Sequence, residues 1–170
     1  MKTILAVLTL SFCVCSFAQT PAAADPTMVL TFGAGASQFS EPHVGITGSF
    51  GVRVADGTYT LTSIDAGAKY DAATKQLVQL STIRTGIQRR LVNAGPLNLF
   101  AALDAGLATG AGATVGSFSG GGSVTYDLPK HPELFVYGAL RAVKAPGDTT
   151  GAVQTAFSVG VGVRIGAAAK

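Results

Sequence analysis

The stretch "VQTAFSVGVGVRIG", from Val153 to Gly166, decides the fold class because its side chains alternate in size almost without interruption. Bulky residues stand at every second position, except at Thr155. The positions between them carry small or amide side chains, with Arg164 as the single charge. Strict alternation with a period of two is typical of a β-strand, because successive side chains point to opposite faces. A strand of a soluble sandwich would carry long polar residues opposite its apolar face, so this stretch raises the question of which solvent the bulky face meets.

The N-terminus, residues 1–18, has the composition of a cleaved secretory signal peptide. Lys2 precedes a short apolar run, and "SFA" ends in a small-x-small pattern that predicts cleavage after Ala18. An uncleaved transmembrane anchor is the alternative, but the run is shorter than the roughly 20 apolar residues that a spanning helix needs. Residues 19–26 are rich in proline and alanine and are predicted to form a flexible tether.

Composition excludes several kinds of site. Both cysteines, Cys13 and Cys15, lie inside the predicted signal peptide, so the mature chain can form no disulfide, thiolate metal site or cysteine nucleophile. Loss of Lys2 with the signal leaves 11 basic and 9 acidic residues. This small excess gives no basic patch of the kind that binds nucleic acid.

From Thr27 onward the chain divides into alternating segments separated by turn signals, such as "ADG" at 55–57. No helix is predicted here, and 170 residues are enough for about one domain. The sequence therefore predicts one all-β domain over residues 27–166 and a tail at 167–170. The eight predicted strands are 27–36, 43–55, 58–70, 75–92, 96–109, 113–127, 133–144 and 151–166.

An even number of segments of about ten alternating residues, behind an export signal, is the signature of a transmembrane β-barrel. With eight strands the interior is just wide enough for side chains to fill, and closure removes the sheet edges that lipid cannot hydrogen-bond. We therefore predict an eight-stranded antiparallel up-and-down transmembrane β-barrel whose bulky face meets lipid. In the second strand, Ile46 and Phe50 would face lipid, and Thr47 and Ser49 would face the lumen.

The export signal, the eight segments and the closing "FSVGVGVRIG" resemble the small eight-stranded outer-membrane barrels of the OmpA/OmpX type. The resemblance covers Thr27 to Gly166 and rests on the pattern of alternation. It implies a protein of the outer membrane in a Gram-negative cell envelope, reached by export through the inner membrane. We expect a monomer that contacts outer-membrane lipid. Barrels of this type usually end in an aromatic residue, whereas this chain continues past Ile165 into "GAAAK".

Candidate catalytic and metal-binding residues are scarce. His43 and His131 lie in predicted loops, and neither has a second histidine or a carboxylate at the spacing of a metal site. Some barrels of this class deacylate lipid A with a histidine–serine pair and a supporting acid, but His131 is followed by Pro132 and Glu133. We therefore predict no catalysis, no metal and no cofactor.

Three functions remain open. The first, which we favour, is an outer-membrane barrel with a structural or interaction role and a lumen plugged by side chains. The second is a soluble, lipocalin-like periplasmic carrier of an apolar ligand, in which the bulky face would line a pocket. The lack of long polar residues opposite Val159, Val161 and Val163 counts against it. The third is a lipid-A-modifying outer-membrane enzyme. The absence of the catalytic residues that such an enzyme needs counts against it.

Basic residues on the small face predict a net positive interior. Arg53, Arg90 and Arg164 each lie about two residues before a periplasmic strand end, so we predict an inward-facing basic cluster at the periplasmic rim. The alternative is that these arginines extend to water at the membrane interface. The six basic residues predicted to face the lumen, against Asp65 and Asp104, are Arg53, Lys69, Arg84, Arg90, Arg141 and Arg164.

A second charged group is predicted in the middle of the barrel. Asp65, Arg84 and Asp104 fall on luminal faces of three consecutive strands at nearly the same depth. Consecutive strands are neighbours in an up-and-down barrel, so Arg84 should lie between the two carboxylates. Arg141 could reach across from the seventh strand and balance the second carboxylate, because an isolated buried charge costs several kcal/mol. We predict a structural Asp65–Arg84–Asp104–Arg141 network that plugs the pore.

Overall fold

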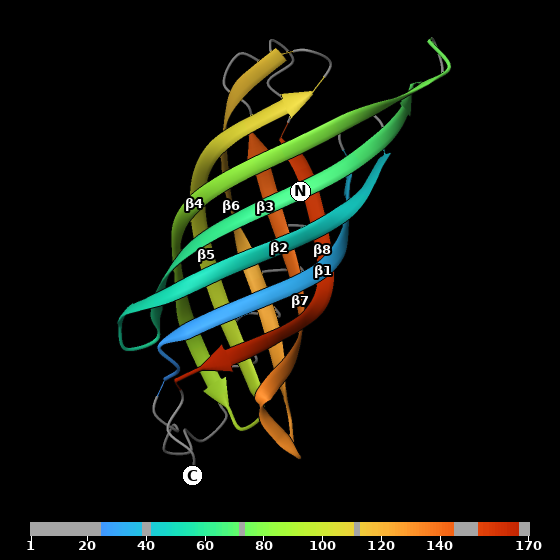
Figure 1. The fold of residues 1–170 in the computed structure, drawn as a ribbon. Coiled ribbons are helices and arrows are strands. Elements are labelled where there is room, and N and C mark those ends of the chain that lie inside the picture. The colour runs from blue at the N-terminus through green and yellow to red at the C-terminus, as the bar shows by residue number, and fades with distance from the viewer. Residues whose placement is uncertain (1–24, 39–41, 72–73, 111–112, 145–152, 167–170) are drawn as a thin grey trace, which may run out of the picture.

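The computed structural model describes residues 25–38, 42–71, 74–110, 113–144 and 153–166. These residues form a closed barrel of eight strands in the order β1 to β8, and the strands are steeply tilted (Figure 1). Within the described part of the chain, no helix is long and apolar enough to cross a membrane. The strands are β1 (Met28–Gln38), β2 (Pro42–Ala55), β3 (Thr58–Asp71), β4 (Gln76–Ala94), β5 (Leu97–Gly110), β6 (Ala113–Leu128), β7 (His131–Lys144) and β8 (Gln154–Ile165).

Every strand pairs antiparallel with its neighbours in the chain, and β1 closes the barrel by pairing with β8. The β2–β3, β4–β5 and β6–β7 connections are short turns at one end, which we call the turn end. The start of β1 and the end of β8 lie at this same end (Figure 1). Gly57 and Gly95 stand in two of these turns with φ values of 65° and 61°, a region where an L side chain is strained.

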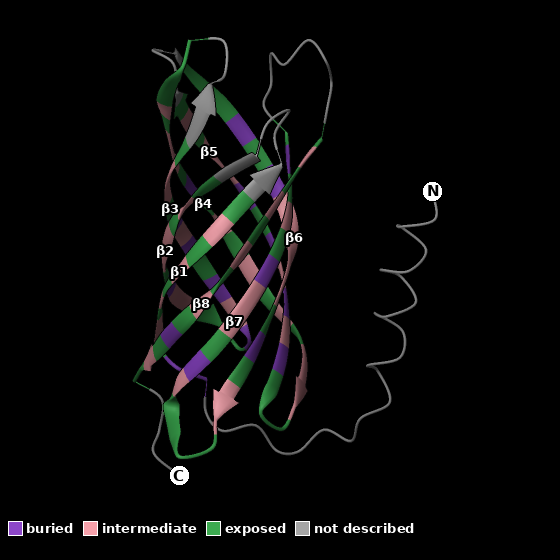
Figure 2. Ribbon diagram, turned by 90° about the vertical axis from the view of Figure 1, so that its right-hand side faces the viewer, coloured by how far each residue is buried: buried purple, intermediate pink, exposed green. Residues whose placement is uncertain are grey.

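Burial alternates along the strands, as the banded colouring in Figure 2 shows. In β8 the pattern is strict, with exposed residues at the odd positions from Thr155 to Ile165 and less exposed residues between them. The bulky face points outward: Phe157 is 50% exposed and Val161 58% exposed. The outer wall is therefore apolar, and the small face lines the lumen, as predicted.

Two aromatic side chains of β7 explain why the inner face of β8 is small. Phe135, only 2% exposed, lies directly over Gly162, its partner in the β7–β8 register. Tyr137 lies over Gly160, and a methyl group added there would meet its ring at 2.8 Å. Gly33 of β1 also faces Tyr137, whose hydroxyl oxygen would lie 2.6 Å from such a methyl group. The glycines of the opening stretch therefore provide the space that these rings fill.

The all-β fold and the closed eight-stranded topology are confirmed, with strand ends that differ by a few residues. The prediction placed His131 in a turn, but it is the first residue of β7. The flexible tether was predicted to extend to Pro26, but Asp25 and Pro26 are buried. The signal peptide, residues 19–24 of the tether and the tail at 167–170 lie outside the described residues.

Candidate functional site

The middle of the lumen holds the four charged residues that were predicted to form a network. Arg84 makes an ion pair with Asp65 of β3 and lies 3.6 Å from Asp104 of β5, measured from Nε to a carboxylate oxygen. Arg141 of β7 makes an ion pair with the other oxygen of Asp104. The structure thus brings Asp65, Arg84, Asp104 and Arg141 together in one chain of alternating charge.

The register shows how these residues meet. Arg84 pairs with Gly106 on β5, and Asp104 pairs with Gly86 on β4, so the two charged residues are offset by two positions. The long arginine side chain spans that offset. Gly106 is required at this point, because a methyl group there would lie 2.6 Å from the Cα atom of Arg84.

Hydroxyl groups complete the network, and sequence reasoning missed them. Thr82 donates a hydrogen bond of 2.7 Å to Asp65, and Ser119 donates one to Asp104. Each is the direct cross-strand partner of its aspartate, so correct strand register would have predicted both. Asp104 has a side chain only 2% exposed, whereas that of Asp65 is 30% exposed. Asp104 is therefore the carboxylate whose charge depends most on its partners.

An aromatic layer separates this network from the turn end. Tyr59 and Phe100 meet edge to face, with ring centroids 6.4 Å apart. Along β3, Tyr59 and Leu61 come between the turn and Asp65, and both are buried. Phe135 fills the same part of the lumen from β7. The lumen between the network and the turn end, which we call the lower lumen, is thus packed with side chains like a small protein core.

The three arginines predicted at the rim are held in two separate groups. Arg90 makes an ion pair with Asp25, and Arg53 donates a 2.9 Å hydrogen bond to the backbone carbonyl of Asp25. Arg164 instead pairs with Asp127 at 2.6 Å. The three arginines thus lie at the turn end near Tyr59, as two groups that are each bound to a different aspartate.

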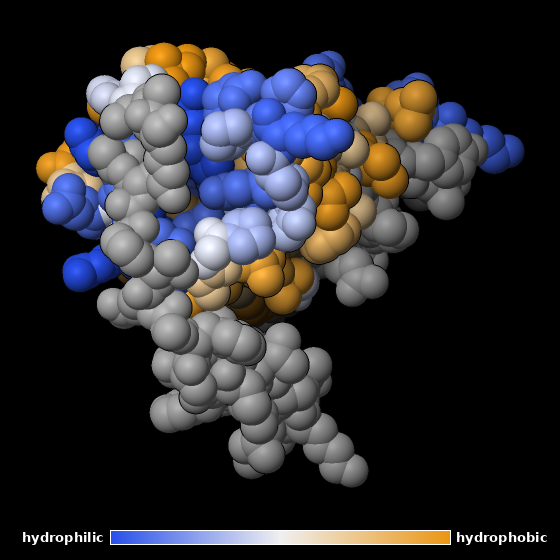
Figure 3. All heavy atoms as spheres, turned by 90° about the horizontal axis from the view of Figure 1, so that it is seen from below, coloured by the Kyte–Doolittle hydropathy of each residue, from blue (hydrophilic) through white to orange (hydrophobic). Residues whose placement is uncertain are grey.

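Arg164 also stacks on an aromatic ring. Its guanidinium carbon lies 4.5 Å from the centroid of Phe135, so it makes a cation–π contact at the edge of the aromatic layer. Its side chain is only 12% exposed. Seen from the turn end, hydrophilic residues gather around the mouth and hydrophobic residues lie outside them (Figure 3).

Asp25 and Asp127 change the predicted charge of the interior. The sequence analysis placed Asp25 in the tether and Asp127 at the last position of a predicted strand, and it counted neither among the luminal charges. Among the described side chains, five arginines and four aspartates line the lumen. The side chain of Lys69, which was also predicted to face the lumen, lies outside the described residues. The described part of the interior therefore keeps the predicted positive sign, but its excess is one arginine, smaller than the predicted six basic residues against two acids. The nine residues are Arg53, Arg84, Arg90, Arg141, Arg164, Asp25, Asp65, Asp104 and Asp127.

No described residues form a group of three or more histidine, cysteine or acidic side chains that could hold a metal ion. His131 contacts Glu133 at 3.2 Å, and both side chains are more than half exposed. The side chain of His43 lies outside the described residues.

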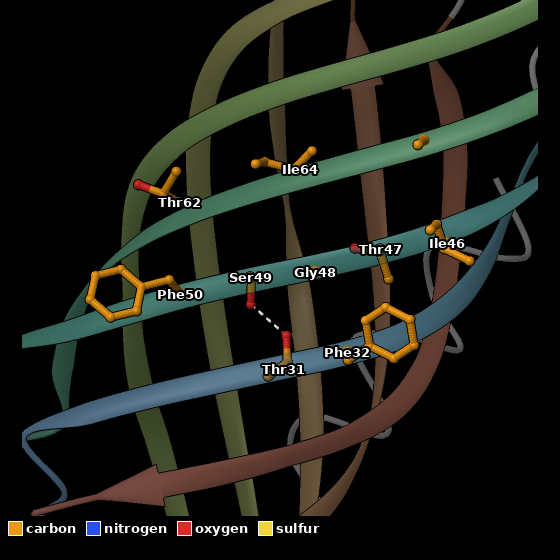
Figure 4. Close-up of a pocket in the computed structure, with 10 residues that line it drawn as sticks. Thr31, Phe32, Ile46, Thr47, Gly48, Ser49, Phe50, Thr62 and Ile64 are labelled. Carbon is orange, nitrogen blue, oxygen red and sulfur yellow. Dashed lines mark hydrogen bonds between the residues drawn. The ribbon is translucent and has the colours of Figure 1, made fainter.

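A depression of about 520 Å³ lies on the outer wall over β1, β2 and β3 (Figure 4). Gly48 leaves it open, and Phe32 and Phe50 project beside it. Phe32 is 61% exposed and Ile64 is 57% exposed, so the depression belongs to the apolar exterior. It is not the interior pocket that a lipocalin-like carrier would need, and the outward direction of the bulky face contradicts that hypothesis.

The chain matches no protein-family model and no curated protein. Its fold does match solved structures. The crystal structure of Neisserial surface protein A has a TM-score of 0.61 at 14% identity, covering 81% of this chain and 96% of that chain. Ail, the attachment invasion locus protein of Yersinia pestis, has a TM-score of 0.55 at 10% identity, covering 85% of this chain and all of that one. The N-terminal β-barrel domain of Pseudomonas aeruginosa OprF has a TM-score of 0.51 at 15% identity, covering 81% and 97%. The chain therefore has the fold of the small eight-stranded outer-membrane barrels, as its resemblance to the OmpA/OmpX type implied.

Proposed function

We propose that the protein is a small outer-membrane β-barrel with a structural or interaction role, a lumen closed by side chains and no catalytic activity. The observation that carries this proposal is the opposite character of the two faces of every strand. The outer wall presents exposed Leu, Ile, Val and Phe side chains, which a membrane would cover. The inner face buries ion pairs and aromatic rings.

Closure of the lumen follows from two layers. The network of Asp65, Arg84, Asp104 and Arg141 fills the middle, and the aromatic layer fills the lumen below it. An eight-stranded barrel is narrow enough for side chains to fill, so two filled layers in series leave no route for a solute.

In this proposal the predicted signal peptide directs export, and the turn end lies in the periplasm. Short turns on the periplasmic side are the usual arrangement in bacterial outer-membrane barrels. Both ends of the barrel domain would then be periplasmic, since β1 begins and β8 ends at the turn end. Contact with outer-membrane lipid over the whole apolar wall is the interaction that the geometry supports best.

A swelling assay on vesicles tests both parts of the proposal. The full chain is isolated from membranes with detergent and reconstituted into phospholipid vesicles, and swelling is measured with a small sugar. We expect the protein to stay with the membrane after a urea wash, to migrate faster on a gel before heating, and to give no swelling above that of empty vesicles. The double variant Arg84→Ala/Phe135→Ala, which thins both layers, should swell faster than the wild type.

Recovery of the unmodified protein in a soluble periplasmic fraction would contradict the membrane assignment. Rapid swelling by the wild type would contradict the closed lumen alone. Mass spectrometry of lipid A from cells with and without the protein tests the absence of catalysis, and a change in acyl content would refute it.

A further inference from the structure

Asp25 and Pro26, close to the start of β1, are buried at the turn end although they belong to no strand. Asp25 is 7% exposed and its carboxylate-bearing side chain 5% exposed. A carboxylate so far from water needs charged or hydrogen-bonding partners. We infer that the turn end contains a carboxylate-binding cradle, formed by Arg90 and the backbone amide of Gly57, whose resident ligand is the chain's own Asp25, and that Arg53 holds the main chain of that residue.

The contacts come from three different elements. The amide of Gly57, in the β2–β3 turn, donates a hydrogen bond to one carboxylate oxygen of Asp25. Arg90 of β4 makes its ion pair with the other oxygen. Arg53 of β2 donates to the main-chain carbonyl of the same residue at 2.9 Å. Each oxygen of Asp25 thus has its own donor, and ionic hydrogen bonds of this kind are among the stronger ones.

Backbone hydrogen bonds fix the strands and the turn that carry the cradle. The backbone amide of Arg90 donates a 2.6 Å hydrogen bond to the carbonyl of Gly57, which fixes the turn against β4. The φ of 65° at Gly57 belongs to this turn geometry, which aims its amide at Asp25. The backbone amide of Arg53 donates 2.9 Å to the carbonyl of Thr27, which fixes the start of β1. The backbone at each donor residue is therefore fixed by the sheet, the turn and the chain that enters β1.

The charge of the cradle favours an anion. Arg53 and Arg90 bring two positive charges. Among the described residues, Asp25 is the one acidic residue that contacts either of them. The guanidinium of Arg90 and the backbone amide of Gly57 form a donor set that suits a small carboxylate, and Arg53 adds a second positive charge beside them.

Seated Asp25 ties together parts that the sheet leaves separate. β1 pairs with β2 and β8, and β4 pairs with β3 and β5. Asp25 links the chain entering β1 to β4 and to the β2–β3 turn, so it cross-links these elements at the turn end, between Tyr59 and solvent. This inference does not depend on whether the lumen is closed to solutes.

Chemical rescue of Asp25→Ala tests the cradle. The full chain is folded in detergent micelles, and the folded fraction is followed by gel mobility across a urea series. We expect the variant to lose about 1 M in its urea midpoint, because the partly buried Arg90 loses its counter-ion. Sodium formate should restore most of that loss, and sodium chloride at the same ionic strength should not. Asp56→Ala is the matched control, because Asp56 is an exposed carboxylate in the same turn.

The urea midpoint of a double variant gives a second test of the cradle. If Asp25 and Arg90 act as one unit, Arg90→Ala should add little to the loss caused by Asp25→Ala. Asp25→Asn, which keeps the shape but loses the charge, should show a smaller shift and serves if the alanine variant fails to fold. Equal midpoints for Asp25→Ala and Asp56→Ala, equal rescue by formate and chloride, or fully additive losses would each overturn the cradle.

Discussion

Removal of Arg84 should weaken the barrel far more than removal of Arg89, its near neighbour on the same strand. Arg84 faces the lumen, and its side chain is 8% exposed. Arg89 is exposed on the outer face of the same strand, and it forms no ion pair with any described residue. The two substitutions to alanine remove the same charge and the same number of atoms from one strand. Their difference therefore isolates the contribution of the network.

The size of the effect follows from what Arg84→Ala leaves behind. Breaking a buried ion pair typically costs about 3–5 kcal/mol, because one charge remains buried without its partner. Asp104 would keep Arg141 and Ser119, and Asp65 would keep Thr82 and is partly exposed, so the lower end applies. We expect a loss of about 3 kcal/mol in the free energy of unfolding, or about 1.5 M in the urea midpoint for a slope of about 2 kcal/mol per M.

Gel mobility of unheated samples across a urea series measures this difference without tryptophan, which the chain lacks. Arg89→Ala should change the free energy of unfolding by no more than about 0.5 kcal/mol. Adding Asp65→Asn to Arg84→Ala should recover part of the loss, because it neutralises the more weakly held carboxylate. Equal losses for the two arginine variants would refute the network and the assignment of the inner face of β4.

Two further predictions concern the lower lumen, and the same urea series measures both. Gly162→Ala should destabilise the barrel by about 1–3 kcal/mol because its methyl group would run into the ring of Phe135, whereas Gly138→Ala, with no atom within 4 Å of the added group, should be nearly neutral. A neutral result for Gly162→Ala would show that the ring moves aside freely. Arg164→Lys should lose about 1 kcal/mol, because lysine keeps the charge beside Asp127 but stacks less well on the ring. Full stability in the lysine variant would mean that the stacking contributes nothing.

The fold could be predicted from the sequence because two environments act on alternate residues of every strand. An apolar exterior and a narrow interior impose a period of two, and this period survives at Arg141 and Phe135, which face the lumen together. The network was also predictable, because up-and-down topology makes consecutive strands neighbours. The offset of two residues between Arg84 and Asp104 was absorbed by the length of the arginine side chain.

What could not be predicted lies where periodicity ends. Asp25 stands in a proline- and alanine-rich segment whose composition resembles a disordered linker, and its partners come from elements up to 65 residues away in sequence. Asp127 lies near the end of β6, close to a register shift, where counting along the strand no longer gives the side chain's direction. The partners of the rim arginines were therefore beyond sequence reasoning, although the arginines themselves were found.

The glycine-lined inner face of β8 also has a consequence for how the barrel closes. The β1–β8 seam joins the two ends of the domain, so it brings together the strands most distant in the chain and pays the largest loop-closure entropy. Along this seam Gly33 pairs with Gly160 and Thr31 pairs with Gly162, so the inner surfaces that meet are nearly flat. The rings that fill this region stand on β7 and reach over the junction from one side. Between Ala156 and Gly162, where Arg164 is not reached, the two strands can therefore approach and form their backbone hydrogen bonds with no large inward side chains from either strand in the way.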